Sequence, residues 1–368
     1  MKILQQCMYF PPEVGGLESY VLDLTSGLVS EGHQVTMLTS RSVPGTAAQE
    51  SVQGVRVIRT WFPGKHPLGW MAHTAASIPS HRRLSRDADV LHAQTFASAP
   101  PSMLVPRRRQ PFVLTLHTSH FQRRSGRRVW RPALRRIIAS ADWLITASAQ
   151  LLDMALDLYP HPRAEALTNA VDTSVFRPTA AALTPSPGRR LIVAPCRLFP
   201  PKGVTHLIDA MPRLRSELDV ELAIIGDGPD RDALERQVRA LDLGDAVRFL
   251  GRRSRHEMPG LLSSGEVIVL PSLMEATSIA ALEAMACGRP VAGSSVGGLL
   301  ELIDEDVGTH FRPADPAHLA ERVAALLTRP DLPEIGARAR RRVEQRWGLD
   351  RLVRRHVDIY QTLLDERL

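Results

Sequence analysis

The sequence predicts an α/β protein with two Rossmann-like domains that face each other across a cleft. Its 368 residues fit two domains better than one. Short strand-like runs alternate with helical patterns from end to end, which is typical of parallel βαβ units. Residues 179–190, rich in Ala, Pro and Ser, lack an apolar face and interrupt this alternation. We therefore expect an N-terminal domain over 1–178, a linker over 179–190, a C-terminal domain over 191–348 and a final helix over 349–368.

The first half of the chain opens with a strand-like run at residues 3–10 and an amphipathic helix at 17–32. One face of that helix carries Leu17, Tyr20, Val21, Leu24 and Leu28. Gly32 is typical of a helix C-terminus. Further strand-like runs occupy residues 34–40, 55–60, 89–94, 112–117 and 142–148.

The second half repeats the pattern after the predicted linker. Its strand-like runs occupy residues 191–195, 220–226, 246–251, 266–271 and 289–294. The last segment, 350–368, is an amphipathic helix whose apolar face has to pack on another part of the chain. We expect it to pack back on the N-terminal domain. In open parallel sheets ligands bind beyond the carboxyl ends of the strands, so the loops at those ends are the first candidates for a site.

Composition narrows the classes of protein that the chain can belong to. Hydrophobic residues make up 44% and charged residues 23%, as in ordinary globular proteins. No apolar run is long enough for a transmembrane helix, and the N-terminus reads as a strand rather than a signal peptide. Cys7, Cys196 and Cys287 are far apart and form no CxxC spacing, which disfavours a disulfide framework or a structural zinc site. We expect a cytoplasmic protein with buried thiols.

The net charge of +7 is concentrated in the first half of the chain. Residues 1–180 hold 20 Lys and Arg against 12 Asp and Glu, whereas residues 181–368 hold 26 against 27. Within the first half, residues 107–136 contain ten Arg and no acid. Such a block indicates an anionic partner, which could be a membrane surface, a nucleic acid or a phosphorylated substrate.

The stretch "MEATSIAALEAMACGRPV", residues 274–291, places two glutamates in a segment that is otherwise small and apolar. Glu275 falls in the loop after a strand, and Thr277 or Ser278 can cap a helix that carries Glu283. Backbone amides at the start of that helix suit a phosphate, and carboxylates suit vicinal hydroxyls. From the residues alone, a solvated helix acid at Glu283 and a loop acid at Glu275 explain the pattern equally well.

Other polar residues also stand where predicted strands end. Arg197 and Lys202 stand at the end of a predicted strand, and Pro200 and Pro201 stiffen the turn between these two cations. Gly15 and Gly16 lie between a strand and a helix, and their missing Cβ atoms allow close approach of a phosphate or sugar.

Several of these residues have a simpler interpretation. Arg197 and Lys202 can be solvated surface bases, and His117, which ends the strand at 112–117, can be a satisfied core histidine. His120 adds no third metal ligand. The GxG at Gly226 and Gly228 is best explained as a turn, with Asp230 as the cap of the next helix.

Taken together, the motifs resemble those of the retaining glycosyltransferase family 4 enzymes, which have the GT-B fold. The E-x7-E of Glu275 and Glu283 is one of them, and the others follow in the same order and spacing along nearly the whole chain. They are "PPEVGGLESYVLDL", "LTLHTSH", "TNAVDTSVF", "CRLFPPKGVTHLIDAM" and "LAIIGDGPDRDALE". The resemblance implies an acceptor-binding N-terminal domain and a C-terminal domain that binds a nucleotide diphosphate sugar.

The resemblance also implies a role for each matching residue. Glu283 would hold the ribose hydroxyls, Glu275 the hydroxyls of the donor sugar, and Arg197 with Lys202 the diphosphate. His117 would lie beside the reacting sugar and orient it. The expected catalytic residues are therefore His117, Glu275, Arg197 and Lys202. The expected donor-binding residues are Gly15, Gly16, Arg197, Lys202, Thr277, Ser278, Ile279 and Glu283. No metal and no cofactor is expected.

Some positions depart from the family pattern. Ala276, Thr277 and Ser278 stand where Gly-Phe-Gly is common, so the identity of the donor sugar stays open, as do the base and the acceptor. Cys196 and Ala170 stand where Gly is common. Two other functions compete with this one: a nucleotide-sugar epimerase or phosphorylase on the same fold, and a non-catalytic sugar-binding protein of two lobes. The first lacks this combination of motifs, and proteins of the second class are usually exported.

The basic block at residues 121–136 favours a lipid or lipid-linked glycan as acceptor. Phe121 and Trp130 interleave there with seven arginines, a mixture that suits the surface of an anionic membrane. We expect reversible docking on the inner face of the plasma membrane. The alternatives are a solvated arginine-rich face with a soluble acceptor, and, more weakly, nucleic acid, for which no binding motif is present.

Overall fold

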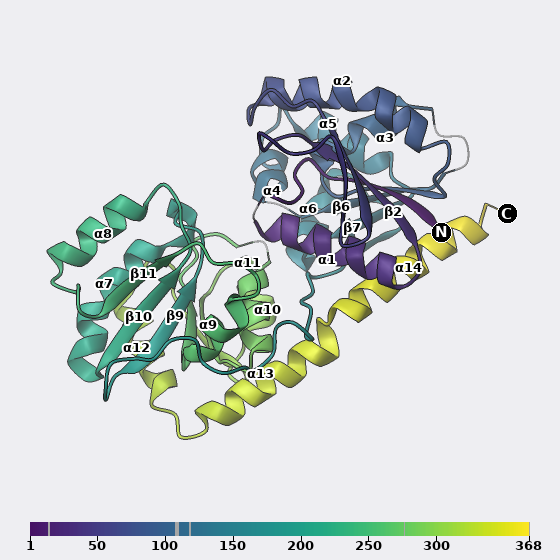
Figure 1. The fold of residues 1–368 in the computed structure, drawn as a ribbon. Coiled ribbons are helices and arrows are strands. Elements are labelled where there is room, and N and C mark those ends of the chain that lie inside the picture. The colour runs from purple at the N-terminus through teal and green to yellow at the C-terminus, as the bar shows by residue number, and fades with distance from the viewer. Residues whose placement is uncertain (14, 107–109, 118, 276, 368) are drawn as a thin grey trace. The chain divides into compact units, whose positions relative to one another are not determined.

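The computed structural model describes residues 1–13, 15–106, 110–117, 119–275 and 277–367, and the chain forms two compact units (Figure 1). Unit 1 comprises Met1–Asn169 and Leu349–Leu368, and unit 2 comprises Ala170–Gly348. The chain thus passes into unit 2 after Asn169, ahead of the segment 179–190 that the sequence indicated as the linker. Both units are α/β, as predicted.

Unit 1 contains an eight-stranded sheet in the order β3-β4-β2-β1-β5-β6-β7-β8. All neighbouring strands are parallel except β3 and β4, which form an antiparallel hairpin at one edge. The strands are β1 Lys2–Gln6, β2 Gln34–Ser40, β3 Gln49–Val52, β4 Val55–Thr60, β5 Val90–Ala93, β6 Phe112–Leu116, β7 Trp143–Thr146 and β8 Ala164–Ala166. The direction of strand order reverses between β1 and β5, where open α/β sheets bind ligands.

Helices connect most of the parallel strands of unit 1, whereas β2 and β4 are connected through β3. They are α1 Gly16–Ser30, α2 Pro67–Leu84, η1 Phe96–Ser98, α3 Pro100–Leu104, α4 Ser119–Ser125, α5 Arg131–Ala139 and α6 Ala149–Leu158. The predicted helix at 17–32 is thus confirmed as α1, and its predicted apolar face is buried at Tyr20, Val21, Leu24 and Leu28.

Unit 2 contains a six-stranded, fully parallel sheet in the order β11-β10-β9-β12-β13-β14. The strands are β9 Arg190–Pro195, β10 Val220–Ile225, β11 Val247–Gly251, β12 Val267–Leu270, β13 Val291–Ser294 and β14 Gly308–Phe311. The helices are η2 Pro200–Lys202, α7 Val204–Glu217, α8 Arg231–Ala240, α9 Met258–Ser264, α10 Ile279–Ala286, α11 Gly297–Leu302, α12 Pro316–Leu327 and α13 Leu332–Arg346. This is the doubly wound order, and its reversal lies between β9 and β12.

Two hydrophobic cores cover the two faces of the unit 2 sheet. Along β9, Ile192 and Ala194 belong to one core, whereas Leu191 and Val193 belong to the other. This follows from the alternation of side chains along a strand, and it explains why the strand is a continuous apolar run in the sequence.

The segment predicted as the linker is hydrogen bonded along unit 2. The amides of Thr179 and Leu183 donate to the hydroxyls of Ser263 and Ser264 at the end of α9, and the amide of Ser186 donates to Glu221 Oε1 at 3.1 Å. Because this polar anchoring satisfies its backbone, the segment does not need an apolar face.

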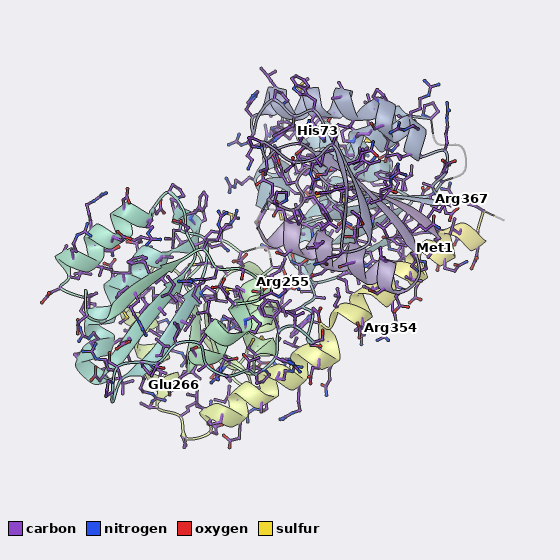
Figure 2. All side chains as sticks on the ribbon, viewed as in Figure 1. Met1, His73, Arg255, Glu266, Arg354 and Arg367 are labelled. Carbon is purple, nitrogen blue, oxygen red and sulfur yellow. The ribbon has the colours of Figure 1, made fainter. Side chains whose placement is uncertain are left out.

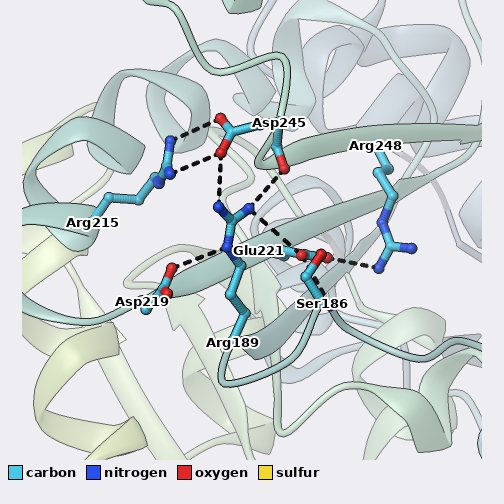
Figure 3. Close-up of polar contacts among 7 residues, drawn as sticks. All are labelled: Ser186, Arg189, Arg215, Asp219, Glu221, Asp245 and Arg248. Atoms are coloured by element: carbon cyan, nitrogen blue, oxygen red, sulfur yellow. Dashed lines mark hydrogen bonds and ion pairs between the residues drawn. The ribbon is translucent and has the colours of Figure 1, made fainter.

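Glu221 is the centre of that anchoring and is only 2% exposed. Arg248 approaches it to 3.0 Å and Arg189 to 3.6 Å, while Arg189 and Arg215 also share Asp245 (Figure 3). Burial alone would raise the pKa of Glu221, but the hydrogen bonds from Ser186 and the charges of Arg248 and Arg189 outweigh burial and lower it.

The C-terminal helix α14, Leu349–Asp365, belongs to unit 1 and packs beside α1 (Figure 1). Gly27 of α1 makes this approach possible, because a Cβ there would lie 2.5 Å from Val353 Cγ2. The buried face of the helix includes His356 and Tyr360, and its exposed face carries Arg354 (Figure 2). Arg355 forms an ion pair with Glu165 at 2.7 Å.

Candidate functional site

At the reversal point of unit 2, the loops after β9 and β12 bring Lys202 and Glu275 together. Lys202 Nζ lies 2.5 Å from Glu275 Oε2, and the hydroxyl of Ser272 donates to the same oxygen at 3.2 Å. The side chains of Lys202 and Glu275 are 24% and 13% exposed. A partly buried pair of this kind fixes a cation and a carboxylate at the edge of the sheet where ligands bind. Ser272 was not singled out from the sequence.

Backbone contacts hold these two loops against each other. The amide of Leu273 donates to the carbonyl of Pro201 at 2.8 Å. Gly203 has φ +63°, and a Cβ at that position would lie 2.1 Å from the carbonyl oxygen of Pro271. Only glycine therefore fits between Lys202 and the helix α7 that follows. These contacts hold the backbone around Lys202 in place, so the fold determines where this side chain starts.

Arg197 follows β9 and is exposed, with its guanidinium carbon 5.4 Å from the ring centroid of Phe199. Its loop is anchored through the neighbouring Leu198, whose amide and carbonyl pair with the backbone of Asp227 and Asp230. Asp230 stands at the N-cap of α8, as predicted, but its side chain makes no capping hydrogen bond because the backbone there is helical.

The two glycines of the GxG motif belong to the same anchoring. A Cβ at Gly226 would lie 1.9 Å from the carbonyl oxygen of Cys196, and one at Gly228 would lie 2.2 Å from that of Leu198. The motif therefore allows the loop of Arg197 to lie directly on the next βα turn. Burial raises the pKa of the Cys196 thiol to about 12, so this residue is not a nucleophile at neutral pH.

The N-terminus of α10 is capped by Ser278, whose hydroxyl accepts from the amide of Ala281 at 3.2 Å. The predicted cap is thus confirmed at Ser278, and Ile279 is the first residue of the helix. The hydroxyl of Thr277 is buried and has no hydrogen-bond partner among the described atoms. Ala276 lies outside the described residues.

Glu283 lies in the second turn of α10 and is half-buried, in a helix whose other residues from Ala281 to Ala286 are fully buried. Together with burial, its charge raises the pKa of the Cys287 thiol to about 12. Glu283 is therefore not an ordinary solvated helix acid.

In unit 1, His117 follows β6 and is buried. Its Nε2 lies 2.9 Å from Gln94 Oε1, and its ring centroid lies 4.4 Å from that of Tyr20 in an edge contact. His117 Nδ1 and Asn169 Oδ1 are both buried without a hydrogen-bond partner among the described atoms. Asn169 is nevertheless close enough to His117 to favour the protonated imidazole and so to raise its pKa slightly. Burial, assisted by the charge of His356, lowers the pKa of His117 to about 3, so the imidazole is neutral at physiological pH. The contacts of His117 with Gln94 and Asn169 were not identified from the sequence.

A chain of buried polar side chains connects His117 to α14. Gln94 Nε2 donates to Gln5 Oε1 at 2.8 Å, and Gln5 Nε2 donates to the hydroxyl of Tyr360 at 3.2 Å. That hydroxyl lies 2.6 Å from His92 Nδ1. Gln5 was not assigned a role from the sequence, because its partners lie far away along the chain.

The backbone at Gly15 leaves less space for a phosphate or sugar than the sequence predicted. Gly16 begins the helix, and Gly15 has an extended backbone with φ 176°. A Cβ at Gly15 would lie 2.4 Å from Glu18 Oε2, so the carboxylate of Glu18 occupies space there.

The basic block at 121–136 is divided between α4, α5 and the turn that joins them. Phe121 is fully buried, so it cannot reach a membrane as expected, whereas Val129 is 81% and Trp130 is 37% exposed. Phe121 is buried because its ring packs with Phe96, at a centroid distance of 6.4 Å. Arg107, Arg108 and Arg109 and the side chain of His120 lie outside what the structure describes.

Within the described residues, no three His, Cys, Asp or Glu side chains converge in an arrangement that could hold a metal ion. The acids Asp227, Asp230 and Asp232 thus form no such group.

Comparison with known proteins relates both halves of the chain to glycosyltransferases. Residues 14–175 match the family model described as Glycosyltransferase Family 4, and residues 178–343 match the model described as Glycosyl transferases group 1. Glycogen synthase from Mycobacterium tuberculosis is 33% identical, and the match covers 93% of this chain and 89% of the relative. A GDP-mannose-dependent alpha-(1-6)-phosphatidylinositol monomannoside mannosyltransferase from the same species is 29% identical over 95% of both chains.

Among solved structures, a sucrose-phosphate synthase from Thermosynechococcus elongatus has a TM-score of 0.87 and 23% sequence identity, with 99% of each chain covered. The chain therefore belongs to the family 4 glycosyltransferases, enzymes that transfer a sugar from a nucleotide sugar, and it has the GT-B fold.

Proposed function

We propose that this protein is a retaining, metal-independent glycosyltransferase that binds a nucleotide diphosphate sugar on unit 2 and an acceptor on unit 1. The observation that supports this most strongly is the Lys202–Glu275 pair at the reversal point between β9 and β12. A cation for the diphosphate and a carboxylate for sugar hydroxyls stand side by side there. Glu283, half-buried on the helix that begins beside them, supplies a second carboxylate for the ribose.

The chemistry follows from where charge develops. When the glycosidic bond of the donor breaks, the diphosphate leaves with the bonding electrons, and Lys202 with Arg197 stabilises the added negative charge. The acceptor oxygen then forms the new bond on the face from which the diphosphate left. By analogy with the family, the leaving phosphate oxygen takes the acceptor proton. The neutral His117 contributes a hydrogen bond rather than a charge beside the reacting sugar.

The ribose role of Glu283 is tested by Glu283→Gln, which keeps the shape of the side chain and removes its charge. Hydrogen bonds to a charged group contribute roughly 1.5–3 kcal/mol each, so donor affinity should fall at least about tenfold. A thermal-shift screen of nucleotide sugars on the wild type selects the donor, and titration of that donor then compares the variants. Glu321→Gln, an exposed acid on α12, is the matched control and should bind as the wild type does. Equal affinity in Glu283→Gln would remove the ribose assignment.

We further propose that the acceptor is a lipid or a lipid-linked glycan. One relative named above acts, by its name, on a phosphatidylinositol monomannoside. On unit 1, Val129 in the basic block is 81% exposed, and Leu68 and Met71 on α2 are 72% and 69% exposed. No helix in the described ranges has both the length and the apolar character needed to cross a bilayer. Reversible docking on an anionic membrane surface therefore brings the enzyme to such an acceptor.

Vesicle sedimentation tests this docking. Wild-type protein should bind vesicles that contain anionic lipid, and binding should weaken as salt rises, because each surface arginine contributes up to about 1 kcal/mol that salt screens. Replacing the exposed Arg123, Arg127 and Arg128 by Ser should abolish most of the binding. Equal sedimentation with neutral and anionic vesicles would instead favour a soluble acceptor.

A further inference from the structure

Arg124, on α4, differs from the other arginines of the basic block because aromatic rings surround its guanidinium. The guanidinium carbon lies 5.0 Å from the ring centroid of Trp130, 5.1 Å from that of Trp70 and 5.4 Å from that of Phe96. These are cation–π distances, and such contacts strengthen when the cation is partly removed from water. Arg124 is half-buried, whereas Arg123 and Arg127 are exposed. The rings therefore hold this guanidinium in a defined place.

Among the described residues, the guanidinium of Arg124 has no counter-charge. No carboxylate there lies within ion-pair distance of Arg124, no acidic side chain influences its pKa, and none of its five N–H groups donates a hydrogen bond to a described residue. Burial comes first among the causes that lower its pKa, and the positive charges of Arg127 and Arg123 add to it. A partly desolvated cation among like charges has a free-energy cost, which an anionic ligand would reduce.

The rings around Arg124 come from segments that meet at the ligand-binding edge of unit 1. Phe96 lies just after β5, and α4 follows β6 and His117. The indole N–H of Trp70 donates to the hydroxyl of Tyr9, just after β1, at 3.0 Å. Strands β1 and β5 flank the point where the sheet order reverses, so Arg124 is held where the acceptor is expected to bind.

We propose that Arg124 and its three aromatic neighbours form a binding site for a phosphate group of the acceptor. This rests on the proposed function, and it specifies the acceptor class as a phosphate ester. The planar guanidinium matches phosphate oxygens in a bidentate contact, and the aromatic rings leave its N–H groups available for that contact. Arg123 and Arg127 add positive charge beside it. A phosphate monoester carries up to two negative charges, which suits this cluster better than the single charge of a carboxylate.

The test uses the full chain and two sources of the same chemistry. In one arm, glycerol 3-phosphate and, for comparison, glycerol are titrated while tryptophan fluorescence is followed, since Trp70 and Trp130 adjoin the site. In the other arm, vesicles of phosphatidylcholine with increasing phosphatidic acid, a lipid whose headgroup is a phosphate monoester, are used. Arg124→Gln should weaken phosphate-dependent binding roughly tenfold, and Arg124→Lys, which keeps the charge without the planar fork, should weaken it by less. Arg135→Gln removes the same charge from an exposed position of α5 and should change binding less than about twofold.

The two arms identify the source of the phosphate. Binding of glycerol 3-phosphate that depends on Arg124 assigns a soluble phosphate ester, and dependence seen only with phosphatidic acid vesicles assigns a lipid headgroup. Equal effects of Arg124→Gln and Arg135→Gln, or no phosphate-dependent binding in either arm, would overturn the site. Nucleotide sugar binding is measured on the same samples. If the wild type does not bind a nucleotide sugar, the proposed function is wrong. If Arg124→Gln still binds it, the variant is folded.

Discussion

Lys202 and Glu275 constrain each other, so a change in one residue alters the other. Lys202→Ala removes a cation from the diphosphate and leaves a partly buried Glu275 without its partner. Removing one such stabilising group costs roughly 10²–10³ in turnover, so kcat should fall by about that factor. Steady-state kinetics with the donor selected by the thermal-shift screen measures this, and Lys202→Arg should retain more activity because it keeps the charge.

The same pair bears on the use of metal. Because Arg197 and Lys202 neutralise the diphosphate in this proposal, turnover should persist in excess chelator, and chelation should cost far less than Lys202→Ala. Loss of turnover with chelator that magnesium or manganese restores would show that the two cations are insufficient.

The role of a single residue could be predicted from the sequence where that role depends on its neighbours along the chain. Ser278 was identified as a cap because of the helix that follows it, and the capping hydrogen bond is present. Gln5 and Glu221 could not be interpreted in this way. Each lies in a strand and is at most 2% exposed, and each is stabilised by partners on other elements, such as Tyr360 and Arg248. Arg124 is a similar case, because its neighbours Trp70 and Phe96 are distant in the chain.

Among the elements, α14 has the most direct link to the candidate site in unit 1. Tyr360→Phe removes the hydroxyl that contacts Gln5 and His92, which leaves buried polar groups short of a partner. Such a loss costs about 1–3 kcal/mol, and part of it should appear as disorder of Gln94 and His117. We expect kcat to fall by roughly tenfold while KM for the donor, which binds unit 2, changes little.

Tyr159→Phe is the control for that experiment. It makes the same chemical change at the end of α6 in unit 1, where no hydrogen bond to the hydroxyl is recorded among the described residues. If Tyr360→Phe lowers thermal stability but leaves kcat unchanged, the polar chain has only a structural role.

The alternation of strands and helices could be predicted from the sequence, because the strands of a parallel sheet that is covered on both faces are apolar runs. The antiparallel β3 was not predicted. Three of its four residues are polar and exposed, so burial leaves no apolar pattern in the sequence. The predicted linker at 179–190 resembled a free segment because hydrogen bonds, rather than apolar contacts, hold it to α9 and Glu221.

For the whole molecule, the two units differ in how they should respond to acid. Unit 1 contains His81, His117 and His356, and burial lowers their pKa values to about 4, about 3 and about 4. An unfolded histidine titrates near pH 6.5, so below that pH the unfolded chain binds protons that the folded unit does not. The resulting loss of stability begins as pH falls below about 6.5, and for His81 alone it amounts to about 3 kcal/mol by pH 4.

The titrating groups with shifted pKa values in unit 2 behave differently. The pKa of Glu221 is lowered despite its burial, and the hydrogen bond from Arg329 lowers that of Asp331 to about 2. Their stabilising effect is complete above the pKa of an unfolded carboxyl, near 4, and is lost only below it. Between about pH 6 and 4.5, unit 1 should therefore lose stability first.

This order can be measured because the tryptophans are unevenly placed. Trp61, Trp70, Trp130 and Trp143 lie in unit 1, and Trp347 lies in unit 2. Thermal melts followed by fluorescence of single-tryptophan variants should show the transition of unit 1 moving to lower temperature as pH falls from 7 to 5, while that of unit 2 stays nearly constant. Parallel shifts of both transitions would contradict the proposed role of the buried histidines.

The return of α14 to unit 1 has a consequence for the order in which the protein is made. The ribosome releases residues 1–169 long before Leu349–Asp365 emerge, so the first unit to be synthesised lacks the helix that covers α1 and pairs with Gln5. Unit 2 is continuous from Ala170 to Gly348 and can close as soon as its last helix is available. Unit 1 is thus completed only after unit 2 has emerged. Until α14 is available, Gln5 and the polar side chains linked to it lack their cover and are accessible to solvent and to cellular chaperones.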